Sequence, residues 1–220
     1  MWQRSNRGEI DGLTRRQLLR RGAMLGASVA GVGVLGRFVS ACSESVAPSG
    51  SVTLDLGTEV GVLNYAYALL QLEADFFTRL VGRFYPGVLV AESALITQAY
   101  TDTEAARDDL HNNQIPTGRI TDAVLFRLGT VVDVSDRTAV LTHARTIEET
   151  AARALQTLAG RAGVPAHQTL LGGLAAKSQA RAAAIDGWLA ATFTPGTVDL
   201  AAAMATLAPY YLTKFTVIHA

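Results

Sequence analysis

The chain has 220 residues, of which 49% are hydrophobic, and this suits one globular domain with an extension. Aromatic residues make up only 7% of the chain while alanine and leucine are frequent, which favours closely packed helices over a sheet sandwich. The formal net charge is zero, but residues 1–41 hold seven arginines and two acidic residues. The remainder has 12 basic and 17 acidic side chains, a net charge of −5, which argues against nucleic acid as a partner.

Residues 1–41 are predicted to be an export signal or a retained membrane anchor. The segment 14–20 has paired arginines followed by two leucines and resembles a twin-arginine signal. An apolar run over residues 22–41, interrupted only by Arg37, is at ~1.5 Å per residue long enough to cross a hydrocarbon layer of ~30 Å. The arginines before this run predict a cytoplasmic amino terminus. The folded part is therefore predicted to be extracytoplasmic (periplasmic in a bacterium) and attached to a membrane through this segment.

Cys42 is the only cysteine, so no internal disulfide can form. The four residues Val-Ser-Ala-Cys that end at Cys42 resemble a bacterial lipobox, which predicts a lipid anchor on Cys42. The alternative is a free thiol in a loop. Residues 42–54 are polar and contain Ser, Pro and Gly, so they are predicted to form a flexible tether before a folded domain over residues 55–220.

Apolar residues at spacings of three and four predict several amphipathic helices in this domain. A connection of about twenty residues, 114–133, separates the second helix from the third and is long enough to cross from one helix pair to another. This pattern predicts an all-α four-helix bundle with a long crossover and a C-terminal extension, whose tail, 210–220, has no clear pattern. The predicted helices span residues 58–83, 89–113, 135–161, 167–192 and 198–207.

Acidic residues interrupt the apolar faces of three of these helices. Glu73 lies on the face of Ala66, Leu70 and Phe77, where a charge must be paired, protonated or bound to a metal. Glu148 has a matching place on the third long helix, and Asp108 and His111 lie three residues apart on the second. Carboxylates and carboxylate-x-x-His pairs on four helices are how bundles hold two iron or manganese ions. The candidate metal ligands are Glu73, Asp108, His111 and Glu148.

The segment Leu72–Phe77 (LEADFF) resembles the first-helix motif of the ferritin-like domain family, in particular its exported, desiccation-associated bacterial members. The resemblance covers roughly residues 55–205. It implies a ferritin-like bundle that binds iron or manganese. It also implies a carboxylate-x-x-His motif on the second helix, which Asp108 and His111 match with Asp in place of Glu, and a glutamate on the third, which Glu148 matches.

The fourth helix departs from the family pattern. Gln179 and Ala182 stand where the resemblance implies glutamate and histidine, so the charge and the imidazole are both missing. Three alternatives remain open: two metal ions, one metal ion held by the four candidate ligands, or none. We favour the third, in which Glu73 and Glu148 hydrogen-bond to His111, to Gln179 or to each other through a shared proton.

The favoured function is a structural one: an accessory subunit or binding module of a membrane complex, with no cofactor and a protein partner in that complex. No other catalytic motif, such as a phosphate loop or a nucleophile elbow, is recognised in the sequence. The alternative is a di-iron or di-manganese protein with oxidase, peroxide-scavenging or metal-handling chemistry.

Overall fold

The computed structural model describes residues 50–115, 117–120 and 124–220. The predicted signal or anchor over residues 1–41 and the predicted lipid site at Cys42 lie outside these residues, as does most of the predicted tether. Within the described part of the chain, every helix is too short or too polar to span a membrane.

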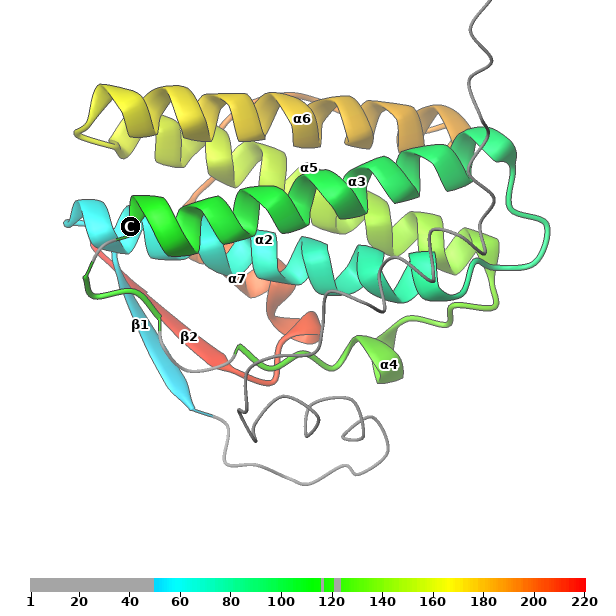
Figure 1. Ribbon diagram of the computed structural model, residues 1–220, viewed down its shortest axis with the longest axis horizontal. Coiled ribbons are helices and arrows are strands. Elements are labelled where there is room, and N and C mark those ends of the chain that lie inside the picture. The colour runs from blue at the N-terminus through cyan, green and yellow to red at the C-terminus, as the bar shows by residue number, and fades with distance from the viewer. Residues whose placement is uncertain (1–49, 116, 121–123) are drawn as a thin grey trace, which may run out of the picture. The chain divides into compact units, whose positions relative to one another are not determined.

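Four long helices form the bundle, as the sequence predicts (Figure 1). Helices α2 and α3 pack as one antiparallel hairpin, and α5 and α6 pack as a second. The two hairpins meet along α2 and α5. The four helices are α2 (Glu59–Gly82), α3 (Val90–Asp109), α5 (Arg137–Arg161) and α6 (Pro165–Leu189).

The helix starts follow from local chemistry. Thr58 caps α2 by accepting a hydrogen bond from the amide of Gly61 at 3.0 Å, and Asp136 caps α5 by accepting one from Thr138 at 2.8 Å. Such caps satisfy amide groups that have no partner inside the helix. Helix α3 continues into a π-helical turn, Leu110–Gln114, so the predicted second helix is continuous to its expected end.

The long crossover between α3 and α5 is hydrogen-bonded to α2 of the bundle. Asn64 of α2 donates to the carbonyl of Gly118 at 2.8 Å and accepts from the amide of Ile120 at 3.1 Å. A short helix, α4 (Leu128–Val131), follows in the same connection. Beyond α6, helix α7 (Leu200–Leu207) packs against α5 and is followed by a 3₁₀ turn.

Two short strands add to the predicted all-helical architecture. β1 (Ser51–Asp55) pairs in parallel with β2 (Lys214–Ile218), with Ser51 opposite Lys214 (Figure 1). Residues 51–54 are part of the predicted flexible tether, and the tail has no predicted structure, so both strands differ from the sequence-based prediction. The buried Leu54 shows why the segment is ordered, since its side chain belongs to the bundle core.

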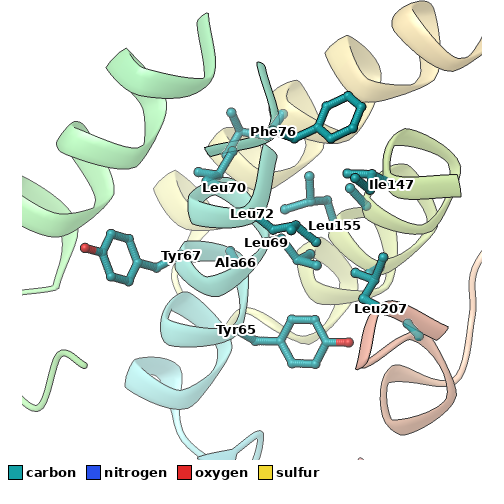
Figure 2. Close-up of a cluster of buried hydrophobic side chains, with 14 of the residues drawn as sticks. Tyr65, Ala66, Tyr67, Leu69, Leu70, Leu72, Phe76, Ile147, Leu155 and Leu207 are labelled. Atoms are coloured by element: carbon teal, nitrogen blue, oxygen red, sulfur yellow. The ribbon is translucent and has the colours of Figure 1, made fainter. Parts of the chain in front are cut away.

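The core is built mainly on α2, whose side chains are buried on several faces. Figure 2 shows Tyr65 of α2 directed towards α7, and its hydroxyl donates to the carbonyl of Leu200 at 2.6 Å. Tyr67 points to the opposite side. The remaining labelled side chains of this cluster are Ala66, Leu69, Leu70, Leu72, Phe76, Ile147, Leu155 and Leu207.

Candidate functional site: a buried arginine between two carboxylates

Glu73 of α2 and Glu148 of α5 meet at the centre of the bundle. Both side chains are completely shielded from solvent. Each occupies an apolar face of its helix, as the sequence predicts, so packing the two helices brings the carboxylates together. Buried carboxylates need a neutralising partner, because desolvation of the charged form is otherwise costly.

That partner is Arg181 of α6. Its Nε donates to Oε1 of Glu148 at 2.7 Å, and its Nη2 donates to Oε2 of Glu73 at 3.1 Å. Ser178, one turn earlier, accepts from Nη2 of Arg181 at 3.1 Å and donates to Oε1 of Glu73 at 3.3 Å. One guanidinium therefore bridges carboxylates from two other helices.

Burial and charge together set the protonation of this cluster. Burial, reinforced by the negative charge of Glu148 and opposed by Arg181, raises the pKa of Glu73 to about 8. Burial also raises the pKa of Glu148, although Arg181 opposes the shift. Burial lowers the pKa of the Arg181 guanidinium, but the two carboxylates more than offset this effect and leave it above its usual value.

The charge balance and the hydrogen bonds of the cluster both indicate that its two carboxylates hold one proton. With all three groups ionised, the buried cluster would carry one net negative charge. Oε2 of Glu148 is buried and has no hydrogen-bond partner among the described residues. One proton held on the two carboxylates would make the cluster neutral, in agreement with the raised pKa of Glu73.

Asp108 and His111 do not hydrogen-bond to this cluster. Asp108 is exposed and pairs with its neighbour Arg107 at 2.8 Å. Nδ1 of His111 lies 3.1 Å from Oδ1 of Asn112, and its ring lies 5.3 Å from that of Tyr67. Of the four predicted ligands, the structure joins Glu73 and Glu148 through Arg181 and leaves the other two in separate interactions.

The positions of these residues along the axes of α2 and α3 explain this separation. Glu73 lies about two and a half turns before the end of α2, so its neighbours on the antiparallel α3 lie a similar distance after the start of α3. Buried Ala99 and Thr103 occupy that stretch, and the hydroxyl of Thr103 donates to the carbonyl of Ala99 at 2.8 Å. His111 lies beyond the end of α3, several turns away.

On α6 the residues that contact the carboxylates are each one position earlier than expected. Ser178 and Arg181 point to Glu73 and Glu148, whereas Gln179 is half-buried and Ala182 is buried in the apolar core. Arg181 is not among the residues predicted from the sequence. Its spacing of seven residues from Leu174 and four from Ile185 nevertheless places it on the core face, which is the signal that predicts its burial.

The donor set at the cluster does not fit a two-metal centre. Such a centre requires several carboxylates and imidazole groups around the ions, and here a permanent cation lies between Glu73 and Glu148. In the described ranges, no three His, Cys, Asp or Glu side chains gather closely enough to hold a metal ion. Metal binding by the predicted ligands stays a prediction.

The helical hairpins, the crossover and the central carboxylates define a four-helix bundle of the kind that houses carboxylate sites between its helices. The family model for the ferritin-like domain matches residues 58–191. The chain therefore belongs to the ferritin-like domain family. A search of curated proteins found no match to the chain.

Proposed function

We propose that this protein is a membrane-attached, extracytoplasmic member of the family in which an arginine takes the place of the metal centre. It acts as a structural accessory subunit or binding module of a membrane complex. The observation that carries the proposal is the guanidinium of Arg181, which hydrogen-bonds to Glu73 and Glu148 in the middle of the bundle. Membrane attachment rests on the apolar segment 22–41 and the lipobox-like residues that end at Cys42.

The chemistry of Arg181 supports a structural role. A guanidinium cannot change its oxidation state, and it remains protonated in proteins. Its forked donors can satisfy two carboxylates at once, and it neutralises one of their two charges. Arg181 thus supplies the charge balance and crosslinking that a bound cation would supply, while it offers no electron to a substrate.

Other buried carboxylates of the bundle are also matched with arginine. Glu92 of α3 accepts from the hydroxyl of Tyr85 at 2.8 Å and pairs with Arg137 at the start of α5. Asp186 of α6 lies 2.6 Å from Nε of Arg145 of α5. Ion pairs of this kind connect the four helices at three places, which supports a bundle whose charged core holds the helices together.

Elemental analysis of protein purified from its own host tests the loss of the metal centre. We expect substoichiometric iron and manganese in the wild-type protein. The double variant Ser178→Glu with Arg181→His, which introduces a Glu-x-x-His motif on α6, should bind more of either metal than the wild type. The matched control, Gln179→Glu with Ala182→His, introduces the same two side chains one position later in α6. Two stoichiometric iron or manganese ions in the wild-type protein would favour the redox alternative and overturn the proposal.

Extraction in mild detergent tests the accessory role. We expect the full chain in the membrane fraction, where it should migrate with a larger protein complex on a native gel. Intact-mass measurement of the extracted chain would show whether it begins at Met1 or at lipid-modified Cys42. A chain found entirely in the soluble extracytoplasmic fraction, migrating alone, would contradict both membrane attachment and the accessory role.

A further inference from the structure

A groove of about 500 Å³ lies between α7 and β2. Its floor is apolar and includes Met204, Tyr211 and Phe215. Two cationic side chains, Arg127 and Lys214, also line it. Both residues are exposed, and neither forms a salt bridge with another of the described residues.

Exposed apolar side chains extend the same surface. Leu212 lines the groove and is 41% exposed, and Ile218 at the end of β2 is 39% exposed. They are two of the five large hydrophobic side chains that stand exposed in the described part of the chain. Apolar side chains beside basic ones are typical of surfaces that rest in the headgroup region of an anionic membrane.

The chain that leads from the predicted anchor arrives at this groove. The carbonyl of Gly50 accepts a hydrogen bond from the amide of Lys214 at 3.2 Å, and β1 then continues alongside β2 (Figure 1). Seven residues lie between Cys42 and Gly50, and the eight Cα-to-Cα steps from one to the other can span at most ~29 Å when fully extended. As a flexible tether they would span on the order of 16 Å. The groove must therefore stay near any membrane that holds Cys42.

Charge favours one orientation at that membrane. Residues after position 41 carry a net charge of −5, so most of the domain is repelled by an anionic lipid surface. Arg127 and Lys214 provide local attraction on the face where the tether enters. We infer that the α7–β2 groove docks on the membrane, with anionic phospholipid headgroups in contact with Arg127 and Lys214. This inference rests on the membrane attachment proposed above.

A fluorescent reporter of lipid contact tests the docking. The full chain is reconstituted into vesicles of phosphatidylglycerol with phosphatidylcholine, or of phosphatidylcholine alone. An environment-sensitive fluorescent amino acid replaces Thr216 in the groove or, as a control, Lys177 on α6. Lipids with a quencher at the headgroup should quench the reporter at position 216 in anionic vesicles, and much less in neutral ones. The reporter at position 177 should be unaffected.

The double variant Arg127→Gln with Lys214→Gln should reduce the ratio of docked to undocked protein by about fivefold for each charge removed. The matched control, Arg107→Gln with Lys177→Gln, removes the same formal charge from α3 and α6, outside the groove, and should leave quenching at position 216 unchanged. If the chain floats with the vesicles but position 216 is not quenched, the docking is overturned and membrane attachment stands. If position 216 is protected without lipid quenching, a protein covers the groove and the docking is likewise overturned. A chain that does not float contradicts the proposed attachment itself.

Discussion

Arg181 is the residue on which the centre of the bundle depends. Removing one partner from a buried ion pair leaves an uncompensated charge, which costs more than the intact pair contributes. Without the Arg181 guanidinium, the carboxylates of Glu73 and Glu148 would face each other with no cation between them, in a site that solvent does not reach. Replacement of the whole cluster by apolar side chains of similar volume would cost far less, because no charge would remain buried.

Arg181→Met should lower the free energy of unfolding by ~3–5 kcal/mol, because Glu73 and Glu148 lose the cation that contacts both of them. Urea denaturation followed by circular dichroism measures this loss. The matched control is Lys177→Met, one turn earlier, whose side chain is 54% exposed and pairs with Asp102 at 3.6 Å. That variant should change the free energy by less than about 1 kcal/mol. Equal effects of the two variants would show that the buried cluster is not a stability determinant.

The residues of the site were only partly predictable from the sequence. Glu73 and Glu148 were found because each interrupts an apolar face, and the structure buries both. Arg181 obeys the same spacing rule on α6, but the family pattern implies metal ligands at positions 179 and 182 rather than a cation at 181. Core phase predicts burial for a charged residue of either sign, and Arg181 is the basic member of this set.

Asn64 holds the crossover against α2. Its amide donates to Gly118 and its carbonyl oxygen accepts from Ile120, so one side chain satisfies two backbone groups of the connection. Gly118 has a φ of 70°, which most residues adopt only with strain. The crossover path therefore depends on a turn glycine and on one buried amide.

Asn64→Ala should accelerate amide hydrogen exchange at residues 117–120 and lower the free energy of unfolding by ~1–3 kcal/mol, because two backbone groups lose their partner. Exchange followed by mass spectrometry gives the first quantity, and urea denaturation gives the second. The control is Asn113→Ala, an exposed residue whose side-chain amide donates to Oδ1 of Asp109 at 2.7 Å. Unchanged exchange at 117–120 in Asn64→Ala would show that the crossover is held by other contacts.

The helices were more predictable than the strands, for a physical reason. Helix faces and caps are local, so α2, α5 and α7 begin within two residues of their expected starts. The pairing of β1 with β2 depends on residues at opposite ends of the domain, and no local pattern specifies such a partner. To predict where Asp108 and His111 lie, the axial alignment of α3 against α2 must be known. Helical periodicity gives the face of a helix but not this alignment.

For the whole molecule, Glu73 makes stability depend on pH. Its pKa of about 8 in the folded protein lies above its usual value of 4.5. The folded state therefore holds a proton that the unfolded state releases earlier as pH rises. This contribution is complete below pH 4.5 and is lost progressively as the pH rises to about 8. Asp55 and Glu59 act in the opposite sense, since their lowered pKa values favour the folded state above their usual range and this gain is lost on acidification.

Glu73→Gln should remove most of the decline in stability between pH 5 and about 8, because glutamine stays neutral in the cluster. The wild-type protein should lose on the order of a few kcal/mol over this range through Glu73. Chemical denaturation at a series of pH values gives the two curves, and Glu104→Gln on α3 is a control outside the cluster. A decline as steep in Glu73→Gln as in the wild type would place the titrating proton elsewhere.

The parallel pairing of β1 with β2 has a consequence for biosynthesis. Ser51 and its neighbours leave the ribosome well before their partners Lys214–Ile218, which lie far later in the chain. The four helices can associate before that point, because each hairpin joins segments that are close in sequence. Completion of the sheet must wait until β2 has been made, so a chain arrested before Lys214 would present β1 without its partner to chaperones and proteases.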